Sequence, residues 1–185
     1  GYVLPKNVPA NEFMNLEGEK ISTSRNWAVW LNDYLKEFPN MQDELRYCLI
    51  TNLPENKDSD FTWKDFQSKN NNELVSILGN YINRVLVLTD KFYDRIVPSC
   101  NSKNKNIIKE IDSLKKSIDK SIKNFKFREA MGFVIDIARL GNKYLTDNEP
   151  WKKFNDDPEN VSEVMFNSIQ IVSKIGILCE PFLPH

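Results

Sequence analysis

One feature constrains the fold of this chain more than any other: an amphipathic pattern that runs without interruption over Glu73–Val97. At about 100° per residue, the apolar side chains of this stretch fall on a single stripe. The stripe consists of Leu74, Leu78, Tyr81, Val85, Leu88, Phe92 and Ile96. Because helical stability comes mainly from packing such a face, a long helix of this kind needs other helices against it. The pattern therefore predicts a helical bundle.

Three further apolar patterns predict the other helices of the bundle. They cover about 105–124, 127–145 and 160–179. Phe125 is expected to face the core just after the first of these helices. Gly132 and Gly141 lie within the second, where small residues favour close contact between helices. The sequence therefore predicts a mainly α fold, in which the bundle follows a short hairpin and a small connecting segment.

The first of these three helices has a basic side opposite its apolar face. Between Lys103 and Arg128 the sequence holds nine cations, Lys105 and Lys115 among them, and three carboxylates. The ordinary interpretation is a solvated surface. The alternative is a surface that steers an RNA backbone toward the bundle.

Composition limits the classes of protein to which the chain can belong. Its 185 residues, 41% of them hydrophobic and 11% aromatic, can bury a substantial core. A net charge of −1 argues against a nonspecific coat for nucleic acid, DNA included, but permits recognition of a few unstacked bases. Because the apolar runs look too short to span a membrane and no signal peptide is recognised, we expect a cytoplasmic protein without a membrane partner.

Cysteine and histidine chemistry is sparse. Cys48, Cys100 and Cys179 are far apart and odd in number, which is typical of reduced thiols. The only histidine, His185, is the last residue. The sequence therefore predicts no metal site and no histidine-based catalytic triad.

The N-terminal part contains signals for short elements. Two short helices are expected over about 26–35 and 43–51. Within the second, Asp43 and Arg46 are three residues apart and are expected to pair on the surface. Phe61, Trp63 and Phe66 are expected to anchor a turn against the long helix.

The polar residues of this part suggest a phosphate site. Gly18 supplies the turn of a predicted hairpin between 13–15 and 20–22. A loop of small hydroxyl residues follows, with Lys20 and Arg25 beside it. Hydroxyls, backbone N–H groups and cations together can bind phosphate oxygens. The alternative is a serine-rich cap on an ordinary helix.

Two polar signals accompany the bundle. Asn80 and Arg84 are four residues apart, so they lie one above the other beside the apolar stripe of the long helix. An amide and a guanidinium in this arrangement can grip a flat polar ligand, although an ordinary solvated flank has the same pattern. Trp151 follows a helix break at Pro150, and it is either a core residue or a platform on which a base stacks.

These motifs resemble those of the methionyl-tRNA synthetases, a family of class I aminoacyl-tRNA synthetases. Residues 15–25, NLEGEKISTSR, resemble the KMSKS signature loop and the hairpin that leads into it. Residues 80–84, NYINR, resemble the anticodon-reading helix, and residues 148–151, NEPW, resemble the second anticodon motif. The three motifs occur in the order of the family, and the resemblance covers essentially the whole chain.

The resemblance implies that the signature loop binds ATP and assists the departure of pyrophosphate. The residues implied for ATP binding are Lys20, Ile21, Ser22, Thr23 and Ser24, with Lys20 and Ser22 in catalytic roles. Thr23 replaces the second lysine of the motif, and a hydroxyl cannot supply that lysine's charge to a developing negative phosphate. Arg25 as a partial substitute and reliance on Lys20 alone both remain open.

The resemblance also implies an α-helical anticodon-binding domain over 72–185, after a loop and connecting segment over 1–71. There Asn80, Arg84 and Trp151 are expected to recognise the CAU anticodon of methionine tRNA, chiefly its first base. Arg84 can donate to a base carbonyl, Asn80 can donate and accept, and Trp151 can stack.

The parent protein is then expected to be an ATP-dependent methionine--tRNA ligase that uses ATP and Mg²⁺. We expect this chain to be its C-terminal portion, inactive in catalysis and able only to bind tRNA. Its other partner would be the missing catalytic domain, and any zinc would belong to that missing part. Two alternatives stay open: the bundle of another class I synthetase, such as the cysteine or leucine type, and a helical scaffold that binds protein.

Overall fold

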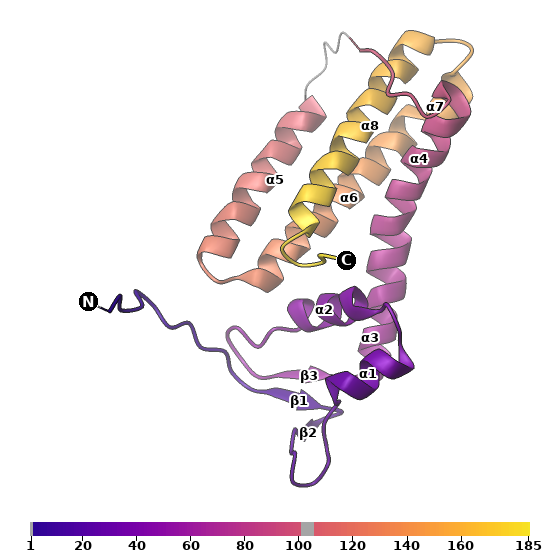
Figure 1. Cartoon of the computed structure of the whole chain (residues 1–185). Coiled ribbons are helices and arrows are strands. Elements are labelled where there is room, and N and C mark those ends of the chain that lie inside the picture. Colours follow the sequence, from indigo (N-terminus) through magenta and orange to yellow (C-terminus); the bar gives the residue numbers. More distant parts are fainter. Residues whose placement is uncertain (1, 101–105) are drawn as a thin grey trace.

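The computed structural model describes residues 2–100 and 106–185 (Figure 1). Its elements are β1 (Met14–Leu16), β2 (Glu19–Lys20), α1 (Leu31–Glu37), α2 (Gln42–Thr51), β3 (Ser59–Phe61), α3 (Trp63–Lys69), the π-helix η1 (Asn70–Gly79), α4 (Asn80–Tyr93), α5 (Asn106–Lys123), α6 (Phe127–Asn148), α7 (Pro150–Lys153) and α8 (Pro158–Cys179). The mainly α fold with a small N-terminal β region is as predicted. Lys103 and Lys105, which were counted in the basic side of α5, lie outside the described residues.

The N-terminal hairpin is present, and a third strand joins it. β1 and β2 are antiparallel, with Asn15 opposite Lys20, and Gly18 takes the positive φ of 78° that the turn requires. β3 pairs with β1 in parallel, which the sequence analysis did not anticipate. The Asp60 carboxylate accepts a hydrogen bond from the Gly18 N–H at 3.0 Å, so β3 also braces the turn.

The helix predicted from residue 26 begins only at Leu31. Ser22 and Trp27 exchange two backbone hydrogen bonds of 2.9 Å and close the segment between them into a tight loop. Asn26 takes a φ of 54° in this loop, which a right-handed helix does not allow. The closed loop therefore replaces the first turn of the expected helix.

The long helix begins earlier than predicted, at Trp63, and continues through α3, η1 and α4 to Tyr93. Trp63 and Phe66 therefore belong to its first turns instead of a separate turn, and the Thr62 hydroxyl caps the start by accepting from the Asp65 N–H. The middle segment, η1, has the wider π-helical turn, and the Ser76 hydroxyl donates to the carbonyl of Asn71, five residues before it.

The predicted stripe extends too far at its C-terminal end. Asp94 and Arg95 have φ values of 48° and 67°, and this left-handed backbone ends the helix after Tyr93. Ile96 consequently lies beyond the helix and is 70% exposed.

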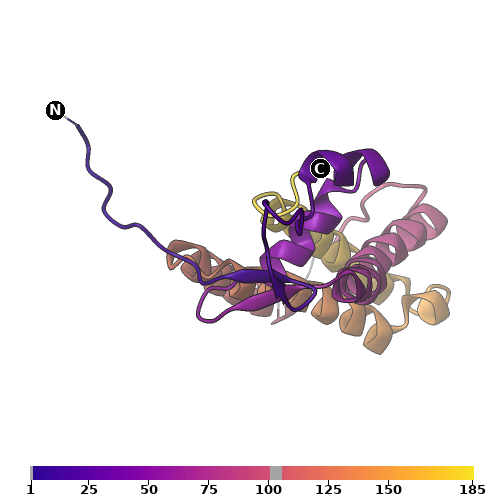
Figure 2. The ribbon, with the colours of Figure 1, turned by 90° about the horizontal axis from the view of Figure 1, so that it is seen from below.

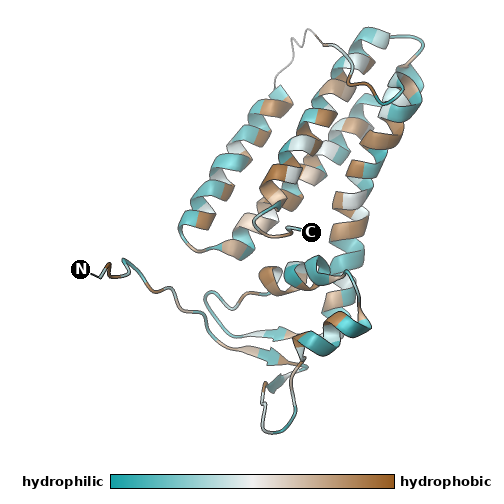
Figure 3. Ribbon diagram, in the orientation of Figure 1, coloured by the Kyte–Doolittle hydropathy of each residue, from teal (hydrophilic) through white to brown (hydrophobic). Residues whose placement is uncertain are grey.

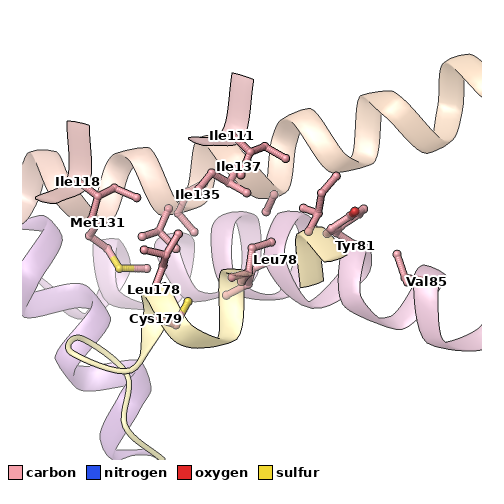
Figure 4. Close-up of a cluster of buried hydrophobic side chains, with 14 of the residues drawn as sticks. Leu78, Tyr81, Val85, Ile111, Ile118, Met131, Ile135, Ile137, Leu178 and Cys179 are labelled. Carbon is pink, nitrogen blue, oxygen red and sulfur yellow. The ribbon is translucent and has the colours of Figure 1, made fainter. Parts of the chain in front are cut away.

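The main core lies between α4, α5, α6 and α8. Figure 4 shows Leu78, Tyr81 and Val85 on the long helix beside side chains of α5, α6 and α8. Hydrophobic residues gather between the helices, whereas the outer side of α5 is hydrophilic (Figure 3). The core therefore uses the part of the predicted stripe that lies at the end of η1 and in α4.

The glycines of α6 divide into two cases. A Cβ at Gly141 would lie 2.3–2.6 Å from ring atoms of Tyr81, so the predicted close contact is confirmed there. A Cβ at Gly132 would meet no atom within 4 Å, so the same prediction is wrong at that position. Phe125 is also wrongly predicted: it is 42% exposed, with a φ of 60° in the turn after α5.

A second, smaller core lies under the sheet. It consists of Leu16, Tyr34, Leu45, Cys48, Phe61 and Phe66. α2 contributes to both cores, because Tyr47 is buried in the bundle and Cys48 is buried in the smaller core. The predicted division into 1–71 and 72–185 stays a prediction, and the long helix crosses it.

The C-terminal residues fold back onto α2. The expected pair between Asp43 and Arg46 is replaced by separate contacts with this C-terminal segment. Arg46 Nε donates to the carbonyl of Phe182 at 2.7 Å, and the Asp43 carboxylate accepts from the His185 N–H at 2.8 Å. Phe182 is 3% exposed, so α2 holds the end of the chain against the bundle.

By length and composition alone α8 could cross a membrane, which the sequence analysis did not expect. Nine of its residues are buried in the bundle, as in a core helix. At the other end of the chain, the residues before β1 extend away from the body of the molecule (Figure 2).

Candidate nucleic-acid interface

The three residues predicted to read an anticodon come from distant parts of the sequence and lie together. Asn80 and Arg84 occupy the first turns of α4, and Trp151 lies in α7. The guanidinium carbon of Arg84 is 5.3 Å from the centre of the Trp151 ring. At this distance a cation is attracted to the face of an indole. The cluster therefore joins a cation, an amide and an aromatic surface.

Local structure explains how Trp151 reaches α4. α6 ends where Glu149 takes a left-handed conformation with a φ of 46°, and Pro150 occupies the first turn of α7. After α7, the Phe154 ring stacks on Phe92 of α4 with 4.3 Å between ring centres. The break and the stack together hold α7 against α4, and Trp151 stays 39% exposed.

Two residues of α6 complete the cluster, and the sequence analysis missed both. The Asn142 carboxamide oxygen accepts from Arg84 Nη1 at 3.2 Å and from Asn80 Nδ2 at 3.5 Å. The Thr146 hydroxyl accepts from Arg84 Nη2 at 3.5 Å. Asn142 and Thr146 are four residues apart, as Asn80 and Arg84 are, and this shared spacing is the signal that could have revealed them.

The cluster can hold a flat, polar, aromatic ligand. Two hydrogen bonds use only part of the five N–H donors of the Arg84 guanidinium, so donors remain for a ligand. Asn80 is exposed and carries both a donor and an acceptor. The partly exposed Trp151 offers a surface for stacking.

The predicted signature loop lies at the opposite end of the molecule from α7 (Figure 1). The Ser22 and Ser24 hydroxyl oxygens are 3.2 Å apart. Arg25 Nη2 donates to the carbonyl of Lys20 at 3.3 Å, while the Lys20 ammonium lies 5.8 Å from the centre of the Phe13 ring. The loop therefore brings its hydroxyls and both cations to one turn.

This donor set fits phosphate oxygens. The Ser24, Lys20 and Arg25 side chains are exposed, and the salt bridge of Arg25 with Glu19 is long, at 3.9 Å. Thr23 carries no charge, and its carbonyl accepts from the Asn26 N–H at 3.1 Å, which fixes the turn. Within residues 2–100 and 106–185, no group of three or more histidine, cysteine or acidic residues is placed to hold a metal ion.

The buried thiols of Cys48 and Cys179 are poor candidates for chemistry. Burial raises the pKa of each to about 11, which keeps the thiol protonated and weakly nucleophilic near neutral pH.

Comparison with known proteins identifies both halves of the chain. Residues 1–86 match the family model described as tRNA synthetases class I (M). Residues 97–185 match the model described as the anticodon binding domain of methionyl tRNA ligase.

Curated relatives agree along the chain. The methionine--tRNA ligase of Flavobacterium psychrophilum is 56% identical over 186 residues, and that of Bacteroides fragilis is 53% identical over 186 residues. Each match covers 99% of this chain and 27% of the relative, so the chain spans about a quarter of their length. These relatives do not support the alternatives of another synthetase or a protein-binding scaffold.

The fold is shared with a solved structure. A Mycobacterium tuberculosis methionyl-tRNA synthetase in complex with methionyl-adenylate superposes with a TM-score of 0.85 at 21% identity. The match covers 95% of this chain and 36% of that one.

Proposed function

The chain belongs to the methionyl-tRNA synthetase family, and from this premise we propose that it recognises the CAU anticodon of methionine tRNA through Asn80, Arg84 and Trp151. The observation that carries the proposal is the contact of Arg84 with Trp151, because it joins two sequence motifs across two elements. Neither residue belongs to the main core cluster, and Trp151 is 39% exposed.

In the proposed complex the first anticodon base leaves the stack of the RNA and lies on Trp151. Stacking of one base on an aromatic side chain is worth about 1–3 kcal/mol and tolerates any base. Arg84 and Asn80 then supply the selectivity, because their donors and the Asn80 acceptor face the Watson–Crick edge of the base. The mechanism separates affinity, which comes mainly from Trp151, from base identity, which comes mainly from Arg84 and Asn80.

We further propose that the signature loop serves the complete protein as part of an ATP-dependent methionine--tRNA ligase in the cytoplasm. Lys20, Ile21, Ser22, Thr23 and Ser24 would bind ATP together with the catalytic domain of the same chain. When ATP and Mg²⁺ are bound, they supply the phosphate chemistry that activates methionine. Lys20 and Arg25 would neutralise phosphate charge, and the hydroxyls of Ser22 and Ser24 would donate hydrogen bonds to phosphate oxygens.

Calorimetric titration with two RNA stem-loops tests the anticodon proposal. One carries CAU, and in the other the first base is changed to U. We expect tighter binding of CAU, a loss of roughly tenfold or more in affinity for Trp151→Ala, and loss of the CAU preference for Arg84→Ala.

The matched control is Lys115→Ala, which removes an exposed cation of α5 away from the cluster. It should leave the CAU preference unchanged. Equal losses in all three variants, with steep salt dependence, would mean that only bulk charge matters and would refute the proposal.

A further inference from the structure

The carboxamide of Asn142 is fixed by the backbone on both sides. Its Nδ2 group donates to the carbonyl of Ile77 at 2.9 Å and to the carbonyl of Ala138 at 3.2 Å. Both partners only accept, so the NH₂ group must face them and the amide cannot be flipped. The oxygen of Asn142 is therefore committed to the side of Arg84 and Asn80.

One of these two anchors lies in the irregular part of the long helix. Ile77 belongs to η1, one turn before Asn80, and its carbonyl accepts from a side chain of α6. π-helical turns are rare and often accompany functional sites. The hydrogen bond fixes the register between α6 and the helix that carries Asn80 and Arg84.

Arg84 is oriented by neutral groups. Within the described residues, no carboxylate lies within ion-pair distance of Arg84; its partners are the oxygen of Asn142, the hydroxyl of Thr146 and the ring of Trp151. A carboxylate would orient a guanidinium more strongly but would also neutralise it. An amide oxygen holds the group in place and leaves its charge for a ligand.

We infer that Asn142 is a positioning residue of the anticodon site. Its oxygen holds the Arg84 guanidinium over Trp151 and draws the Asn80 amide to the same side, so that both read one base in a fixed arrangement. The inference rests on the proposed function, because the arrangement matters only if the cluster reads a base.

The test measures the ratio of the dissociation constants for the UAU and CAU stem-loops in the 185-residue chain. For Asn142→Ala we expect this ratio to fall about tenfold, or about 1.4 kcal/mol, because Arg84 loses its fixed orientation. If Asn142 had a merely structural role, its substitution would weaken the binding of both stem-loops equally and leave the ratio unchanged.

A second variant and a second background keep the test valid even if Asn142→Ala disturbs the folding of the chain. Asn142→Asp keeps the size of the side chain but gives Arg84 a charged partner, so the ratio should fall here as well. In an Arg84→Ala background, Asn142→Ala should cause no further loss of the ratio, because a residue that acts through Arg84 has nothing left to position.

Asn167→Ala is the matched control. Asn167 is a buried amide that also joins two helices, since it donates to the Tyr144 hydroxyl at 3.2 Å. Tyr144 lies two residues after Asn142 on α6 and so faces a different direction. The control should leave the ratio unchanged.

The failures can be told apart. The proposed function fails, and the inference with it, if the unmodified chain binds both stem-loops equally. It also fails if Arg84→Ala leaves the ratio of the two dissociation constants unchanged. Only the inference is overturned if Arg84→Ala lowers the ratio to about one while either Asn142 variant leaves it unchanged. The same holds if the losses of the ratio caused by Arg84→Ala and Asn142→Ala add in the double variant.

Discussion

Alanine substitutions at two glycines of α6 should change the free energy of unfolding in opposite directions. In the interior of a helix, alanine is about 0.8–1 kcal/mol more favourable than glycine. At Gly132 the added Cβ would meet nothing within 4 Å, so Gly132→Ala should raise the free energy of unfolding by about 1 kcal/mol. At Gly141 the same atom would lie 2.3 Å from the Tyr81 ring.

The Tyr81 ring has no easy way to move. Its side chain is fully buried, and its hydroxyl donates to the carbonyl of Ser168 at 3.2 Å. Overpacking a core of this kind costs about 1–3 kcal/mol, and the short contact points to the upper end. After the gain in helix propensity is subtracted, Gly141→Ala should lower the free energy of unfolding by about 2 kcal/mol. The two variants should therefore differ by about 3 kcal/mol.

Urea unfolding followed by far-UV circular dichroism measures this difference, with the slope m checked for each variant. For a chain of this size, about 1 kcal/mol corresponds to a shift of about 2–4 °C in the melting temperature, which gives an independent measurement. Equal effects of the two substitutions, or a stabilised Gly141→Ala, would refute the close contact between α4 and α6 at Tyr81.

The remaining predictions concern the C-terminal segment and the buried thiols. Arg46→Ala removes the hydrogen bonds to the carbonyls of Phe182 and Pro181. It should therefore lower the free energy of unfolding by about 1 kcal/mol and speed proteolysis after Cys179. Unchanged proteolysis would contradict the conclusion that Arg46 fixes this segment. Burial raises the pKa of Cys48 and Cys179 from 9.0 to about 11, so each contributes stability that is complete below pH 9 and lost as the pH rises toward 11. Urea titrations over this range should show a decline that Cys48→Ala reduces, and a decline unaffected by that substitution would assign the effect to other groups.

Sequence patterns predicted those features of the fold that depend on periodicity. Leu78, Tyr81 and Val85 recur at helical spacing, and the structure buries all three in the main core. The hairpin was predictable from Gly18, because few other residues tolerate its backbone conformation. These features are local, so a short window of sequence contains the information that specifies them.

The predictions that failed near the ends of helices depend on backbone conformations that side-chain type does not reveal. Asn26 and Asp94 take left-handed conformations that change where helices begin and end, and Phe125 takes one just after α5, where it is 42% exposed. β3 was missed because Ser59 and Asp60 give it no strand-like alternation, and its pairing with β1 is contact between distant segments.

The candidate site shows the same division. The spacing of Asn80 and Arg84 and the helix break before Trp151 marked these residues as candidates, but only the resemblance to the family joined them into one site, and their role stays a prediction. The structure brings the three side chains together. In sequence, only its spacing of four residues from Thr146 distinguishes Asn142 from other polar residues on the flank of α6, and that spacing is common in helices. The positioning role that we infer for it arises only when α6 packs beside η1 and α4, which brings the Ile77 carbonyl to one side of its amide and Arg84 to the other.

Because α2 belongs to both cores, it determines how the chain unfolds. Tyr47 and Cys48 are neighbours in sequence, yet each is buried in a different core, and the Tyr47 hydroxyl also donates to Glu73 on the long helix. Fraying of α2 would expose apolar surface in both cores at once. Although separate family models match the two halves, the chain should therefore melt as one cooperative unit, and neither half should retain its full stability when cut from the other.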